Sequence, residues 1–157
     1  MNYRGKTVWI TGASSGIGQA VAAYLSKQAY IVYGGSRSAT PHTDFYAIKL
    51  DVTSDDSVIS VVSEIIEKEG RIDVLVNNAG ILVYGEVVNT ELEKVRDILQ
   101  LHMNTPVMLC RLFGEQMVHD KKGYILNVSS ISAVMPYPTI ALYGPTKTLL
   151  SKFTREL

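Results

Sequence analysis

Tyr143 and Lys147 place a phenol and an ammonium four residues apart, the pair of side chains in this sequence best suited to proton transfer. Residues four apart share one face of a helix. Pro145 is compatible with a helix that begins near Tyr143, because proline is tolerated in a first turn. A nearby ammonium favours the phenolate, so Tyr143 is a candidate general acid for a carbonyl or general base for an alcohol. The alternative is that the pair is only a solvated helix face.

Ser130 is a second candidate, because it lies just past the strand-like run from Tyr124 to Val128. Ligands of open α/β sheets collect at the carboxyl ends of the strands. We therefore expect the Ser130 hydroxyl to lie at that edge, where it can hydrogen-bond a substrate oxygen and hold it against the phenol.

A glycine-rich turn follows the first apolar run, Thr7 to Ile10. Gly12 permits a tight turn, Gly16 lets a pyrophosphate approach the backbone, and Gly18 lets the next helix pack close to the sheet. The N–H groups and the dipole at the start of that helix then face the phosphates. The spacing Gly-x-x-x-Gly-x-Gly leaves a plain strand-to-helix turn open as the alternative. The residues predicted to bind a dinucleotide here are Gly12, Ser14, Ser15, Gly16, Ile17 and Gly18.

The residues after the second apolar run indicate which dinucleotide fits. An acidic side chain at that place accepts hydrogen bonds from the adenosine ribose and repels a 2′-phosphate. This sequence has Arg37 there and no carboxylate. A guanidinium pairs with a 2′-phosphate, so we predict NADP(H) in preference to NAD(H). The alternative is that Arg37 is a solvated surface residue.

The strands and helices that must position these side chains are predicted to alternate along the chain. Short apolar runs that read as strands are separated by stretches with helical periodicity, which predicts a parallel sheet covered on both faces. The fold class is α/β, a doubly wound, Rossmann-like parallel sheet in one dinucleotide-binding domain over residues 1–157. The five predicted strands are 7–10, 30–33, 45–50, 72–76 and 124–128, and the principal helices begin near Ile17, Ser54, Glu91 and Tyr143.

The composition excludes several classes of partner. Fifteen Lys and Arg balance fifteen Asp and Glu, so neither nucleic acid nor an anionic membrane is an expected partner. No apolar run approaches the 18 or so residues of a spanning helix, and no signal peptide is recognisable. The single cysteine, Cys110, cannot form an internal disulfide. We therefore expect a cytoplasmic protein with no metal site.

Taken together, these residues resemble the short-chain dehydrogenase/reductase family in its ordinary oxidoreductase branch. The resemblance spans residues 6 to 153. The segments that carry it are Thr11 to Gly18, Asp51-Val52-Thr53, Asn77-Asn78-Ala79-Gly80, Asn104, Ser130 and Tyr143-x-x-x-Lys147.

The resemblance implies an NADP(H)-dependent enzyme that interconverts a small carbonyl compound and a secondary alcohol by hydride transfer. Tyr143 would exchange the proton and contact the cofactor, and Lys147 would lower the pKa of Tyr143 and bind the nicotinamide ribose. Ser130 would orient the carbonyl, and Asn104 would help to hold a water in a relay to Lys147. The adenine would contact Asp51 and Val52, and Asn78, Ala79 and Gly80 would line the cofactor trough. Of the family's two basic positions for NADP, only the one at Arg37 is basic here, because the other is Ser15.

Asn104 has independent support from Pro106. Proline lacks an N–H, so the carbonyl of His102 loses its helical partner and the helix is expected to kink there, freeing backbone groups to hold a water. The local alternative is that Asn104 caps a second helical segment with Pro106 in its first turn. The three histidines are read as surface or packing residues.

The sequence ends at Leu157, before the sixth strand of a doubly wound sheet and further family elements. Five strands are therefore present and the C-terminal strands are missing, so the fifth strand would be an exposed, association-prone edge. Three accounts remain open: a longer enzyme of which this is a part, a truly short protein, or a homo-oligomer that completes the sheet or the pocket. The rival to the enzyme is a truncated, catalytically silent nucleotide-binding or interaction protein of the same fold.

Overall fold

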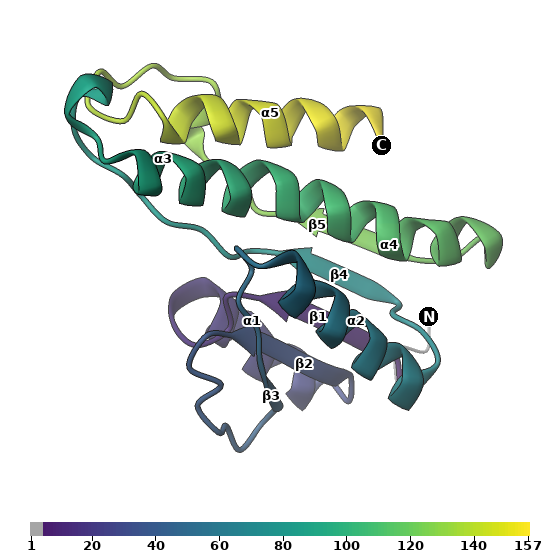
Figure 1. The fold of residues 1–157 in the computed structure, drawn as a ribbon. Coiled ribbons are helices and arrows are strands. Elements are labelled where there is room, and N and C mark those ends of the chain that lie inside the picture. The colour runs from purple at the N-terminus through teal and green to yellow at the C-terminus, as the bar shows by residue number, and fades with distance from the viewer. Residues whose placement is uncertain (1–4) are drawn as a thin grey trace.

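A computed structural model describes residues 5–157 (Figure 1), so the first four residues of the predicted domain lie outside the described part. Five parallel strands form one sheet in the order β3-β2-β1-β4-β5. The predicted doubly wound α/β class is confirmed. The strands are β1 (Thr7–Thr11), β2 (Ile31–Ser36), β3 (Tyr46–Lys49), β4 (Val74–Asn77) and β5 (Tyr124–Asn127).

Helices cover both faces of this sheet. The helix α1 packs on one face, and α2 and α4 pack on the other, while α5 lies beside α3 (Figure 1). None of the helices within residues 5–157 has the length and apolar character needed to cross a bilayer. The helices are α1 (Gly16–Lys27), α2 (Asp55–Glu69), α3 (Leu92–Leu99), α4 (Thr105–His119) and α5 (Tyr143–Glu156), with short 3₁₀ turns at Val87–Asn89 and Ile131–Ala133.

The alternation of side chains along β1 divides the core into two. Val8 and Ile10 point toward α1 and pack with Ala22. Trp9 points to the opposite face, where its ring meets the Phe113 ring of α4 edge-on at 5.4 Å between centroids. All five side chains are buried. Since the central strand is apolar on both faces, only a sheet covered on both sides can bury it.

The second strand is longer than its apolar run. The sequence predicts a strand over 30–33 that stops before Gly34, but β2 continues through Gly34 and Gly35 to Ser36. A Cβ at Gly34 would collide with the Phe45 ring, and one at Gly35 would lie 2.6 Å from Leu50. The glycines therefore belong to the strand because large side chains from the next segment cross directly over it.

The long helical region is interrupted at the place that Pro106 predicts. Between α3 and α4 lies one π turn, Gln100–Asn104, in which the Thr105 N–H bonds the Gln100 carbonyl. Such a turn inserts a residue and rotates the next helical segment around the helix axis. Pro106 occupies the first turn of α4, where its missing N–H costs little.

Candidate active site

A cleft of about 420 Å³ opens at the carboxyl ends of β1 to β4. All the residues predicted to bind the dinucleotide line it, except Gly16, Tyr143 and Lys147. The predicted residues that line the cleft are Gly12, Ser14, Ser15, Ile17, Gly18, Arg37, Asp51, Val52, Asn78, Ala79 and Gly80.

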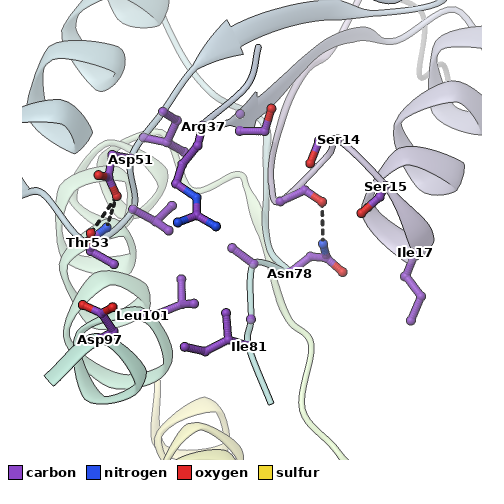
Figure 2. A pocket seen from close by; sticks show the side chains of 18 residues that line it. Ser14, Ser15, Ile17, Arg37, Asp51, Thr53, Asn78, Ile81, Asp97 and Leu101 are labelled. Carbon is purple, nitrogen blue, oxygen red and sulfur yellow. Dashed lines mark hydrogen bonds between the residues drawn. The ribbon is translucent and has the colours of Figure 1, made fainter. Parts of the chain in front are cut away.

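The ends of β1 and β4 are tied together at the floor of the cleft. The Thr11 Oγ1 accepts the N–H groups of Asn78 and Ala79, at 3.1 and 3.0 Å. In return, the Asn78 amide donates to the Thr11 carbonyl at 2.9 Å and to the Gly12 carbonyl at 3.3 Å. Figure 2 draws the second of these bonds. The chain reverses its winding between β1 and β4, which is the switch point where doubly wound sheets bind ligands.

The glycine-rich turn is shaped for close approach of backbones. Gly12 has a φ of +72°, and a Cβ there would lie 2.8 Å from the Ala79 Cα. A Cβ at Gly18 would collide with the Gly12 carbonyl, so only glycine lets α1 start this near to β1. The side chain of Ser15 does not cap α1, which leaves the first N–H groups of the helix available to an anion.

Charged side chains mark the far end of the cleft. The Arg37 guanidinium points into it, between Asn78 and the Asp51–Thr53 side (Figure 2). Within residues 5–157, no carboxylate forms an ion pair with Arg37. The Asp51 carboxylate accepts the Thr53 hydroxyl and N–H, at 2.7 and 3.0 Å. These bonds, followed by the charge of Arg37, hold the pKa of Asp51 below its usual range.

Tyr143 begins α5 and Lys147 lies one turn later, as the spacing predicts. The Lys147 Nζ is 5.8 Å from the centroid of the Tyr143 ring and donates to the Val128 carbonyl at 2.9 Å. Lys147 is 4% exposed, and this burial lowers the pKa of its ammonium. A Cβ on Gly80 would lie 3.7 Å from this Nζ. The amine therefore adjoins the Gly80 end of the cleft.

Ser130 precedes the 3₁₀ turn Ile131–Ala133, and its Oγ accepts the N–H and hydroxyl of Ser132, at 3.2 and 2.9 Å. This turn is docked on α5. The Thr148 hydroxyl donates to the Ala133 carbonyl at 2.8 Å, and a Cβ on Gly144 would lie 3.1 Å from the Ser132 carbonyl. Ser130 is thus bonded to a turn that packs against the helix that carries the phenol.

Asn104 is not brought to this group. Its side chain is exposed and donates to the Gln100 side chain at 2.9 Å. The side chain of the π turn that contacts Tyr143 is the buried His102, whose ring meets the Tyr143 ring edge-on at 5.4 Å. The π turn decides which of the two faces α5, and a strict helical period does not reveal it.

Several lining residues were missed by the sequence analysis. Asp97 and Leu101 reach the cleft from α3 and the π turn (Figure 2). Their spacing of four on a helix is a signal that they share a face, but nothing in the sequence indicates that this face meets the cleft. The remaining lining residues outside the prediction are Gly35, Ser36, Leu50, Thr53 and Ile81.

Residues 6–157 match the family model of the short chain dehydrogenases, so the chain belongs to the short-chain dehydrogenase/reductase family. A 3-ketodihydrosphingosine reductase of Bacteroides thetaiotaomicron is 35% identical over 151 residues, covering 96% of this chain and 56% of that protein.

Two solved structures share the fold. A short-chain dehydrogenase from Streptomyces avermitilis has a TM-score of 0.90 and 32% identity, over 99% of this chain and 60% of that one. A metagenomic short-chain oxidoreductase in complex with NADP has a TM-score of 0.90 and 25% identity, over 99% of this chain and 76% of that one. The chain thus spans little more than half the length of the Bacteroides reductase and three quarters of the metagenomic protein.

Proposed function

We propose that this chain carries the cofactor-binding and proton-transfer parts of an NADP(H)-dependent oxidoreductase that interconverts a small carbonyl compound and a secondary alcohol. The observation that carries the proposal is that the cleft and the Lys147–Tyr143 pair both adjoin Gly80. The cleft of the switch point reaches this glycine, and the buried Lys147 ammonium beside Tyr143 lies next to it. A dinucleotide held by the cleft residues would therefore have the Lys147 ammonium and the Tyr143 phenol within the same site.

A nicotinamide dinucleotide bound here supplies the hydride chemistry, and the residues of this chain bind it and manage the proton. Tyr143 gives its phenolic proton to a carbonyl oxygen, or takes one from an alcohol. The ammonium of Lys147 stabilises the charge on the phenolate. The Ser130 hydroxyl donates to the substrate oxygen and orients it.

The preference for NADP(H) rests on Arg37. Its guanidinium points into the cleft and is free of ion pairs within residues 5–157, so it is available to a 2′-phosphate. The relative solved with NADP is consistent with this preference. The first N–H groups of α1 are available to the pyrophosphate.

Replacing Tyr143 with Phe tests the mechanism. We expect turnover of a carbonyl substrate, followed through NADPH absorbance, to be abolished, because no other group is assigned the proton. NADPH affinity, measured by fluorescence titration, should change by less than about threefold, since the cleft is intact. Retained turnover would refute the mechanism. A wild-type protein that binds NADPH and turns over no carbonyl compound or alcohol would favour the silent binding protein.

We also propose a cytoplasmic homo-oligomer. Cys110 is a free, buried thiol, which suits a reducing compartment. At the sheet edge, β5 exposes Tyr124 and Leu126, the kind of apolar surface that association covers. Sedimentation of the intact protein tests the association, and a monomer at micromolar concentration would contradict it.

A further inference from the structure

His102 is buried in the π turn, 1% exposed, with both ring nitrogens engaged. The Nε2 accepts the Ile81 N–H at 3.0 Å. The Nδ1 lies 3.0 Å from the Thr146 Oγ1. One bond leads to the segment that lines the cleft after β4, and the other leads to the first turn of α5. The proton transfer described above uses neither bond.

The two bonds define the state of the ring. Because Nε2 accepts a backbone N–H, it carries no proton, and the proton of the neutral ring is on Nδ1. The Nδ1–H then donates to Thr146, whose hydroxyl donates to the Tyr143 carbonyl at 2.8 Å. The charged and titratable groups that face the ring are Lys147 and Tyr143. Burial, and then the charge of Lys147, lowers the pKa of His102 to about 4, so the ring stays neutral.

The surroundings are fitted closely to the ring. A Cβ on Gly80 would lie 3.1 Å from Nε2. The ring also packs against Tyr143, with an angle of 77° between the planes. The ring therefore contacts both the Gly80 end of the cleft and Tyr143, and its two bonds connect the Ile81 backbone to the first turn of α5.

We propose that His102 is a positioning residue that clamps the Gly80–Ile81 segment of the cleft to the first turn of α5. It thereby sets where Tyr143 and Lys147 stand relative to a bound dinucleotide. The proposal rests on the proposed function for its catalytic consequence, while the clamp itself is a property of the folded chain. Misplacing a reacting group by about 1 Å can cost a hundredfold in rate, so such a clamp has a measurable effect.

Three substitutions of His102 and one of its partner, made in the intact protein, separate the two bonds. His102→Phe keeps a ring and removes both. His102→Gln keeps an acceptor near the Nε2 position, and His102→Asn keeps a donor near the Nδ1 position. Thr146→Val removes the hydroxyl partner. The matched control is His119→Phe, because His119 is exposed and its ring pairs only with Asp120 among the described residues.

We expect His102→Phe to lower kcat about tenfold to a hundredfold, with NADPH affinity changed less than about threefold. His102→Gln should recover part of this loss. Independently of turnover, exchange of the Ile81 amide should be slow in the wild type, faster in the Phe variant and slow again in Gln. Nitrogen-15 spectra of the wild type should show a neutral ring protonated at Nδ1.

Each outcome bears on the clamp separately from the enzyme. A folded His102→Phe variant with unchanged Ile81 exchange would overturn the clamp, whatever the activity. If Ile81 exchange is faster in His102→Phe but its kcat equals that of His119→Phe, the clamp exists and the positioning role is overturned. If the wild type shows no turnover but the exchange pattern holds, the proposed function fails and the clamp stands.

Discussion

Arg37 and Asp51 place opposite charges at one end of the cleft, and we propose that the two serve different parts of a dinucleotide. The Asp51 carboxylate is occupied by the Thr53 hydroxyl and N–H, whereas the Arg37 guanidinium has no ion-pair partner within residues 5–157. The choice between the two nicotinamide cofactors is thus expected to depend on Arg37.

Arg37→Asp should weaken NADPH binding by about tenfold to a hundredfold, because it removes a charge-assisted bond of about 1.5–3 kcal/mol. NADH affinity should change less than about threefold. Fluorescence titration with both cofactors measures this, and Arg155→Asp, an exposed substitution in the last turn of α5, is the control. Equal losses for both cofactors would refute the 2′-phosphate role.

His102 also links stability to pH. Its pKa is lowered from 6.5 to about 4 in the folded chain, so between these values the unfolded chain binds the proton and the folded chain does not. The free energy of unfolding should therefore fall as the pH drops from about 6.5 to 4, by up to about 3 kcal/mol from this group. Urea unfolding across this range should show the loss in the wild type and a smaller one in His102→Gln. Identical profiles would contradict the burial of a neutral ring.

At the scale of elements, the approach of α1 to β1 makes the cleft. The backbones of α1 and of the turn after β1 lie so close that a Cβ at Gly18 would collide with the Gly12 carbonyl. The start of α1 has no side-chain cap. The contact gives α1 its direction and turns its first N–H groups toward the cleft. A change here should therefore affect stability and cofactor binding together.

Gly18→Ala should destabilise the protein by about 1–3 kcal/mol, because the methyl group overfills a packed contact, and it should weaken NADPH binding at least tenfold. Gly114→Ala is the matched control, since a Cβ on this glycine of α4 has open space around it. It should stabilise by about 0.5–1 kcal/mol and leave binding unchanged. Urea unfolding and fluorescence titration measure both. A neutral Gly18→Ala would show that α1 can move away from β1.

For the whole molecule, the cleft takes its walls from both halves of the sheet. The turn after β1, the ends of β2 and β3, the segment after β4 and the α3 side all contribute. A ligand in the cleft contacts both halves and stabilises the folded chain over the unfolded one.

NADPH at a hundred times its Kd should add about 2.7 kcal/mol to the free energy of unfolding. Thermal unfolding with and without NADPH measures this, and it requires no turnover, so it applies to the enzyme and to a silent binding protein alike. The same concentration of NADPH should have a smaller effect on Arg37→Asp. An unchanged melting temperature for the wild type would contradict binding in this cleft.

The sequence predicted the sheet, the glycine-rich turn and the start of α5 because each depends on local signals. The extent of β2 could not be predicted, since it is decided by Phe45 and Leu50 crossing over its glycines. That His102 faces Tyr143 could not be predicted either, because the π turn rotates the chain by a residue that no periodicity records. Both differences arise where tertiary packing overrides a local pattern.

The central place of β1 has a consequence for the order of folding. Its pairing with β2 joins residues about two dozen apart, as in Val8 with Val32, whereas its pairing with β4 joins Val8 to Val74. The β1–β4 pairing closes the longer loop and costs more entropy, so we expect the β1–β2 half to assemble first. The switch point then exists only after the second half docks. A cofactor bound at the switch point should therefore leave the folding rate unchanged and slow unfolding, which lengthens the lifetime of the native chain.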